Sequence, residues 1–224
     1  MIGENLLRFK KNQKYLTLDY ETSGLCLSSA IDNSGAINTP WQLGMSVYSG
    51  KNLVLEKEHW VKWDHKWEMG ADAARITGFD WNTYNERATD AVKIRDEFEK
   101  YLYDEDYLIV GQNIVGFDLY VDQIYRKLLG RPVRFDWVRR ILDTQLLHKA
   151  IELNVTPPQI GTDAWVSFLF KMNSYRSRKL KSSLKHLVGV YGIDYEPDRH
   201  HNSATYDNSL CFQVLQKQLY KLEI

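Results

Sequence analysis

The sequence predicts an α/β fold in which a mixed sheet is flanked by helices. Two observations carry this prediction. Three β-prone segments follow one another in the first part of the chain, and segments with helical spacing then alternate with a short apolar strand. We expect the first three strands to form an antiparallel meander and the later strands to join the sheet in parallel.

The meander is predicted from three stretches rich in β-branched and aromatic residues, at positions 15–20, 41–48 and 53–63. A polar stretch containing Gly and Ser, residues 23–39, separates the first two. The turn 49–52 joins the second to the third and contains Gly50, which suits a tight hairpin.

The rest of the chain is predicted to be mainly helical. Residues 107–111 form a short apolar run that fits a buried strand, and residues 141–144 fit either a strand or the start of a helix. Residues 154–181 are expected to be irregular because they contain a Pro pair and a basic run. The predicted helices cover residues 90–102, 119–129, 144–153, 183–190 and 204–222.

Composition excludes several classes of protein. The 224 residues are 44% hydrophobic and 26% charged, and 29 basic residues balance 29 acidic ones, so no global field gathers polyanions. Two cysteines make neither a disulfide framework nor a zinc finger, and no apolar run approaches the length of a membrane span. We expect one domain over residues 1–224, in the cytoplasm and with no membrane contact.

The first acidic motif is Asp19-Tyr20-Glu21-Thr22-Ser23-Gly24, at the end of the first predicted strand. Residues i and i+2 of a strand share a face, so Asp19 and Glu21 point into one site. Two adjacent carboxylates repel each other unless a divalent cation neutralises them. The alternative is that both simply end a strand in water.

Two further acidic positions stand at predicted junctions. Asp118 follows an apolar strand and a Gly-containing loop, and either serves a site or caps the helix after it. Asp207 lies in a predicted helix after the histidine pair His200 and His201, which alone would fit a solvated loop.

Together these motifs resemble the DEDD, or DnaQ-like, superfamily of 3′–5′ exonucleases, in the branch that uses a catalytic histidine. Asp19 to Gly24 is similar to its first motif, Asn113 to Asp118 to its second, and Asp207 to its last metal ligand. Residues 73–79 (AARITGF), 142–144 (LDT) and 180–193 are similar to connecting segments of the family. The resemblance spans residues 15 to about 215 and implies a ribonuclease H-like fold.

The resemblance implies a metal-dependent exonuclease that removes nucleoside 5′-monophosphates from the 3′ end of single-stranded DNA or RNA. Two Mg²⁺ or Mn²⁺ ions would be bound by Asp19, Glu21, Asp118 and Asp207. Thr22, Ser23, Leu25 and Asn113 are expected at the substrate, with Asn113 anchoring its loop, and Asp143 is expected to make structural hydrogen bonds. A polymerase or replication partner is possible, and a stand-alone enzyme of bacterial or viral origin is favoured.

The histidine departs from the family pattern. The family histidine lies five residues before the last aspartate, and this position is Asn202. The branch that uses tyrosine is excluded, because its position is Ser203. We expect His201 to act as the general base through one extra loop residue; otherwise the base has been lost to Asn202.

Two other function classes stay open from the sequence. One is a non-catalytic nucleic-acid-binding module on the same fold, against which four retained carboxylates argue. The other is a zinc hydrolase using His200 and His201, which lacks a spaced second histidine motif. The basic run 176–181 either contacts phosphates or is a solvated loop.

Overall fold

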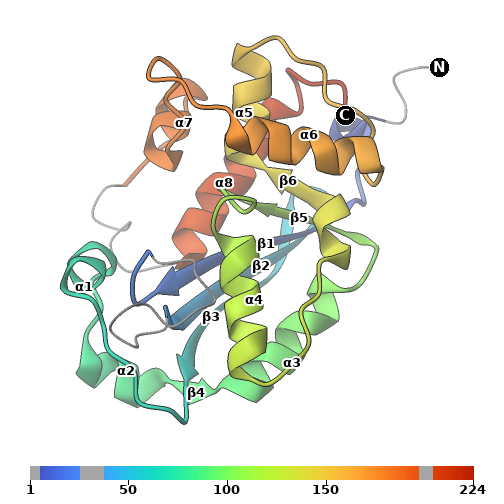
Figure 1. Cartoon of the computed structure of the whole chain (residues 1–224). Helices are drawn as coiled ribbons and strands as arrows, with labels where there is room; N and C mark the ends of the chain where they lie inside the picture. The colour runs from blue at the N-terminus through green and yellow to red at the C-terminus, as the bar shows by residue number, and fades with distance from the viewer. Residues whose placement is uncertain (1–5, 26–37, 197–203) are drawn as a thin grey trace.

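The computed structural model describes residues 6–25, 38–196 and 204–224 (Figure 1). In this part of the chain the strands form one sheet in the order β4-β3-β2-β1-β5-β6. The pairs β1–β2 and β2–β3 are antiparallel, and β1–β5, β5–β6 and β3–β4 are parallel, so the predicted mixed sheet is confirmed. The strands are β1 Lys14–Thr22, β2 Pro40–Ser49, β3 Asn52–Lys62, β4 Thr89–Asp90, β5 Tyr107–Gly111 and β6 Ile141–Asp143.

Helices cover both faces of this sheet, as the alternation of side chains along β1 shows. Tyr15 contacts Phe212 of α8, whereas Tyr20, of opposite parity, contacts Phe98 of α3 and Tyr125 of α4. The α-helices are α1 Ala71–Thr77, α2 Trp81–Arg87, α3 Ala91–Leu102, α4 Asp118–Leu128, α5 Thr144–Glu152, α6 Asp163–Ser174, α7 Leu184–Val190 and α8 Ala204–Gln218, with short 3-10 turns at Leu7–Phe9 and Asp136–Arg140.

The segment 154–181 differs from the prediction, because it contains helix α6. Thr162 caps this helix by accepting a hydrogen bond from the backbone N–H of Trp165 at 3.2 Å. Trp165, Leu169 and Met172 recur at helical spacing and are buried. The Pro pair precedes the helix and the basic run follows it, so the prediction of an irregular segment was wrong for its middle.

Two other predictions are refined. Residues 141–143 are strand β6 and Thr144 begins α5, so both interpretations of residues 141–144 hold in succession. Helix α8 ends at Gln218 and not at 222. No helix in the described ranges combines the length and the apolar character that crossing a membrane requires.

Candidate active site

Asp19 and Glu21 lie near the carboxyl end of β1, on the face that α8 covers. The strand that leads to them is buried, with Leu16 and Leu18 at most 2% exposed, while both carboxylate residues are half-buried. The apolar approach therefore delivers two acidic side chains to the rim of the core and not to open solvent.

Asp118 is brought to the same end of the sheet by β5. This strand runs parallel to β1, so the loop that leaves it emerges beside Glu21. Asp118 begins α4 and is 2% exposed, and its Oδ1 accepts a hydrogen bond from the backbone N–H of Tyr20 at 3.1 Å. This bond joins α4 directly to the residue between Asp19 and Glu21.

The loop before Asp118 is shaped by Asp143. Its two carboxylate oxygens accept from the backbone N–H groups of Asn113 at 3.0 Å and Val115 at 3.1 Å. The same carboxylate caps α5 by accepting from Gln145 and Leu146. Burial raises the pKa of Asp143 to about 6, against the effect of these hydrogen bonds. The expected structural role of Asp143 is confirmed.

Asn113 has a left-handed backbone, with φ of 63°, and its carbonyl accepts from the N–H groups of Gly116 and Phe117. Its side-chain oxygen lies against Gly116, where an added Cβ would come within 2.3 Å of it. The side chain and backbone of Asn113 thus hold the turn that positions Asp118.

Asp207 comes from α8, and Gly44 of β2 allows that helix to approach. Gly44 pairs with Asp19 across the sheet, and a Cβ on Gly44 would lie 2.6 Å from the Cβ of Ala204. Ala204 is the first residue of α8, and Asp207 lies one turn further on. Close contact between the start of α8 and β2 therefore places Asp207 over the end of β1.

The four carboxylates lie close enough for their charges to act on one another. Burial raises the pKa of Glu21 well above its ordinary value, and the charges of Asp19, Asp207 and Asp118 raise it further. Burial, followed by the charge of Asp19, likewise raises the pKa of Asp118. Burial raises the pKa of Asp207 to about 7. We call Asp19, Glu21, Asp118 and Asp207 the acid cluster.

The donors of the acid cluster suit a divalent cation, because carboxylate oxygens are the ligands that hard cations such as Mg²⁺ prefer. A bound cation would also offset the repulsion between neighbouring carboxylates, which disfavours their charged forms. Within the described residues, however, no three His, Cys, Asp or Glu side chains are placed where they could hold one ion together. Cation binding there would require the carboxylates to rotate toward a common point.

A cavity of about 500 Å³ opens beside Glu21, between the end of β1 and α1. Thr22, Ser23 and Leu25 line it, and Leu25 is 83% exposed. The Thr22 hydroxyl donates to the Gly24 carbonyl at 2.6 Å, and the Ser23 hydroxyl accepts from the Thr39 N–H at 2.8 Å. Phe117, next to Asp118, closes one side and Ile76 of α1 another. Three of the four residues expected at the substrate therefore line one cavity, and Asn113 lies outside its lining.

The histidine pair falls outside the described residues. His200, His201, Asn202 and Ser203 all belong to the range 197–203, so the expectation for the general base stays a prediction. Sequence reasoning missed two residues that position the site: Gly44, whose signal was a glycine inside a strand, and Asp122, which is treated below.

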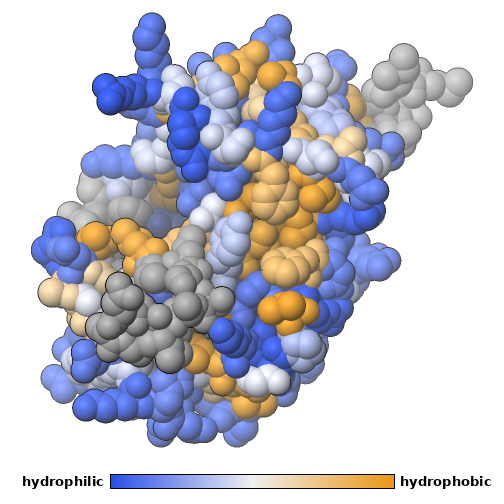
Figure 2. Space-filling view, viewed as in Figure 1, coloured by the Kyte–Doolittle hydropathy of each residue, from blue (hydrophilic) through white to orange (hydrophobic). Residues whose placement is uncertain are grey.

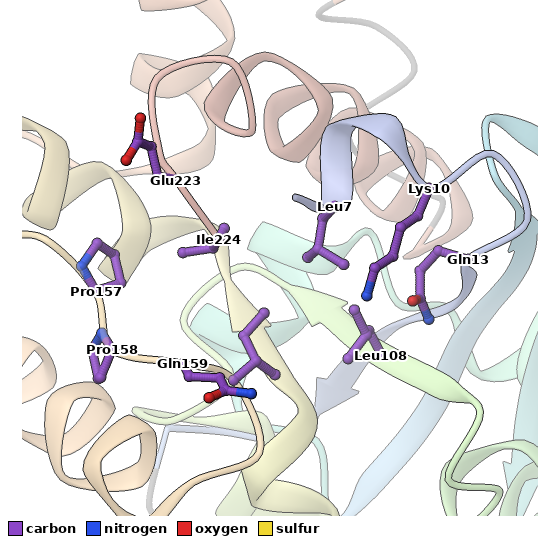
Figure 3. Close-up of a pocket in the computed structure, with 10 residues that line it drawn as sticks. Leu7, Lys10, Gln13, Leu108, Pro157, Pro158, Gln159, Glu223 and Ile224 are labelled. Atoms are coloured by element: carbon purple, nitrogen blue, oxygen red, sulfur yellow. The ribbon is translucent and has the colours of Figure 1, made fainter. Parts of the chain in front are cut away.

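A second cavity, of about 610 Å³, lies near the amino end of β1 (Figure 3). Lys10 and Gln13 line it together with Leu7 and Leu108, opposite Pro157, Pro158, Gln159, Ile160, Glu223 and Ile224. None of the predicted site residues that the structure describes lines this cavity. The acid cluster thus lies at the other end of β1, beside the smaller cavity.

Solved structures with a similar architecture include several of E. coli exonuclease I. One, in complex with a 5cy-dT13 oligonucleotide, matches with a TM-score of 0.64 and 17% identity over 94% of this chain and 40% of that chain. The zinc ion bound form of the exonuclease I–ssDNA complex matches with a TM-score of 0.65 and 16% identity, over 93% and 40% of the two chains. The chain has the fold of exonuclease I. The predicted ribonuclease H-like architecture is therefore confirmed.

The chain spans about two-fifths of the exonuclease I chain that it matches. A further structure of exonuclease I, described as suggesting how processivity is achieved in that enzyme, gives a TM-score of 0.65 at 17% identity. No protein-family model and no curated protein sequence matches the chain. At this identity the likeness to exonuclease I concerns the fold, and the chemistry is argued from the residues of the chain itself.

Proposed function

We propose that residues 1–224 form a metal-dependent 3′–5′ exonuclease domain that acts on single-stranded DNA or RNA. One observation carries the proposal. Carboxylates from β1, α4 and α8, up to 188 positions apart in the sequence, lie beside a cavity; burial raises the pKa values of Glu21, Asp118 and Asp207, and the charge of Asp19 raises the first two further. The exonuclease I fold, solved with oligonucleotides in that protein, supports a nucleic-acid substrate.

Asp19, Glu21, Asp118 and Asp207 would hold two divalent cations, Mg²⁺ or Mn²⁺. Bound there, the ions would neutralise the carboxylates and stabilise the negative charge that develops at the scissile phosphate. The Tyr20 N–H keeps Asp118 beside β1, and the close approach at Gly44 keeps Asp207 over Asp19. These contacts position the three elements that carry the four carboxylates, and in this proposal the carboxylates turn toward the ions when these bind.

The cavity beside Glu21 has the character expected of a nucleotide subsite. Leu25, Ile76 and Phe117 offer apolar surface to a base, and the Thr22–Gly24 turn offers polar backbone atoms to a sugar. The terminal nucleotide would lie with its base there and its phosphate at the acid cluster. Among the described residues that line this cavity, none is a recognisable reader of a ribose 2′-hydroxyl, so the proposal includes both DNA and RNA.

For the general base we propose His201. Histidine suits this role because its ordinary pKa of about 6.5 lies near neutral pH. We expect His201→Ala to lower the cleavage rate about 10²–10⁴-fold and to remove the limb of the pH–rate profile between about pH 6 and 7. His200→Ala is the matched control and should have a mild effect. If both variants stay active and Asn202→His accelerates cleavage, the base has been lost to Asn202.

The test of the whole proposal is digestion of matched DNA and RNA oligonucleotides carrying a 5′ label, with product sizing. A ladder that shortens by one nucleotide at a time from the 3′ end, requires Mg²⁺ or Mn²⁺ and stops with EDTA is expected. Binding without cleavage under every cation would favour the non-catalytic module. Cleavage with Zn²⁺ alone would favour the zinc hydrolase.

A further inference from the structure

The connection from α6 to the first turn of α7 carries charge of one sign only. Between Asp163 and Asp194 the sequence contains no Asp or Glu and six Lys or Arg residues. Five of them are clustered, and we call them the basic segment: Arg176, Arg178, Lys179, Lys181 and Lys185. The whole chain has no net charge, so the acidic residues that balance this local excess of positive charge lie elsewhere in the sequence.

All five side chains of the basic segment are exposed, and none pairs with a carboxylate in the described part of the chain. Some other cations at the surface are paired, such as Lys14 with Asp106 at 2.7 Å and Arg139 with Asp163 at 2.5 Å. Within the segment, Arg176 donates only to backbone carbonyls of its own helix end. The positive charge of the segment is thus available to an anion from outside.

Ser182, between Lys181 and Lys185, ties the segment to the loop that precedes Asp118. The side-chain amide of Gln112 donates to the Ser182 carbonyl at 2.6 Å, and its oxygen accepts from the Thr144 hydroxyl at 2.5 Å. Gln112 directly follows β5 and begins the loop that Asp143 shapes. The segment therefore flanks the element that supplies one carboxylate of the acid cluster.

The last cation of the segment, Lys185, lies near Tyr195. The Lys185 ammonium lies 6.0 Å from the centre of the Tyr195 ring. Burial raises the pKa of the Tyr195 phenol, and the nearby carboxylate of Asp207 raises it further. Tyr195 thus lies near Lys185 and within reach of the charge of Asp207. Figure 2 shows strongly hydrophilic side chains over the α6–α7 connection, at the upper left. In the same view in Figure 1, the β1 arrow points toward the left side of the molecule.

We propose that the basic segment binds backbone phosphates of a single-stranded polynucleotide whose 3′ end lies at the acid cluster. Cations track a strand through its phosphates, which carry no sequence information, so this surface would serve affinity and not specificity. The inference rests on the proposed function for the direction of the strand, but the binding itself can be measured without cleavage.

The test compares two triple variants with equal loss of charge. The first, Arg178→Gln/Lys179→Gln/Lys181→Gln, neutralises three cations of the basic segment. The control, Lys10→Gln/Lys11→Gln/Lys51→Gln, neutralises three exposed cations at the amino end of β1, about 26 Å from its carboxyl end at 3.3 Å per residue. Binding of a fluorescent 15-nucleotide oligothymidylate is measured by anisotropy in EDTA, from 50 to 200 mM salt.

Each phosphate contact on a single strand contributes about 0.7 to the slope of log affinity against log salt. Three lost contacts lower that slope by about 2. The wild type and the control should therefore lose about 20-fold more affinity across the salt range than the first variant does. On a dinucleotide, too short to reach the segment, the first variant should cleave at the wild-type rate.

Equal salt slopes for the two triple variants would overturn the inference. So would tight binding of a fluorescent deca-glutamate peptide that the first variant loses, because the segment would then serve an acidic protein. The first variant can show a reduced salt slope even if the wild-type protein cleaves no oligonucleotide. That result would support the basic segment as a phosphate-binding surface and contradict the proposed exonuclease function. Failure of the inference and failure of the proposed function are therefore distinguishable.

Discussion

Asp118 and Asp122 lie one turn apart on α4, and both are buried, at 2% and 1% exposed. Their surroundings have opposite sign. Asp122 forms an ion pair with the fully buried Arg95, which also contacts Glu99 at 2.6 Å. Asp118 accepts from a backbone N–H, and the charge of Asp19 raises its pKa. A buried carboxylate that has its own guanidinium stabilises the fold, whereas one placed among other carboxylates is suited to a cation from outside.

Tyr20 stands between these two carboxylates. Its backbone N–H donates to Asp118, and its hydroxyl donates to Asp122 at 3.2 Å. One residue of β1, Tyr20, therefore links the Asp122–Arg95 ion pair to the acid cluster. Substitutions at each position can separate the structural from the functional half of this arrangement.

The largest contrast is expected between Asp118→Asn and Asp122→Asn. Asp118→Asn should lower cleavage about 10³-fold or more, because stabilisation worth several kcal/mol is lost, while the melting temperature stays level or rises as a repelling charge is removed. Asp122→Asn should lower the free energy of unfolding by about 3 kcal/mol, since Arg95 loses its ion pair with Asp122 and keeps only the one with Glu99, and the melting temperature by about 6–12 °C. Single-turnover rates and thermal melts check both. Equal effects of the two substitutions on rate and stability would contradict the assignment of a functional role to Asp118 and a structural role to Asp122.

The pH dependence of stability should sharpen the same contrast. Folding raises the pKa of Asp207 from an ordinary 3.8 to about 7, so the folded state binds more protons than the unfolded state between these values. Stability is then greatest below about pH 4 and is lost as the pH rises toward 7. For half-buried Asp207, screened by solvent, the loss should be about 1–2 kcal/mol in EDTA.

Divalent cation should restore that stability at pH 8, by about 2.7 kcal/mol at one hundred times its dissociation constant. Urea titrations at pH 5 and 8, with and without Mn²⁺, measure both effects. Asp207→Asn should flatten the cation-free profile. A profile that is already flat in the wild type would mean that the Asp207 carboxyl has its ordinary pKa.

Gly44→Ala tests how α8 delivers Asp207. The new Cβ would lie 2.6 Å from that of Ala204, so the start of α8 must shift. We expect a stability loss of about 1–3 kcal/mol and a larger proportional loss of cleavage, because Asp207 moves with the helix. Gly189→Ala is the matched control, since a Cβ there meets nothing within 4 Å and should stabilise α7 by up to about 1 kcal/mol.

Tyr20→Phe is expected to have the smallest effect. It removes the hydroxyl bond to Asp122 and keeps both the ring contacts and the backbone bond to Asp118. A stability loss of about 1 kcal/mol and a rate within a few fold of the wild type should follow. A loss of cleavage without a loss of stability would instead place the hydroxyl in the positioning of Asp118.

Local signals predict much of this molecule. The β-prone residues at positions 15–20, 41–48 and 53–63 predicted the meander, and Gly50 has the positive φ that its hairpin turn requires. The role of Asp143 also followed from sequence. Helix α6 was missed because the Pro pair and the basic run on either side outweighed its apolar spacing, and the short helices α1 and α2 carried no periodic signal of sufficient length.

The sequence predicted which four residues make up the acid cluster. It did not predict the tertiary contacts that position them. Pairing of Asp122 with Arg95, which lies 27 positions earlier on another helix, has no signature in either local sequence. The approach of α8 to Gly44 likewise depends on how a distant helix crosses the sheet. Such contacts are tertiary, and spacing along the chain does not encode them.

The placement of Asp207 on α8 also sets an order of events during synthesis. Asp19 and Asp207 are 188 residues apart, a distance that a ribosome covers in about 10–40 s. The hairpins of β1, β2 and β3 are local and can form within that interval, whereas the packing of α8 on β1 and β2 must wait for the helix to emerge. A growing chain therefore carries Asp19 and Glu21 for many seconds before their distant partner arrives, and no nascent protein can complete the acid cluster early.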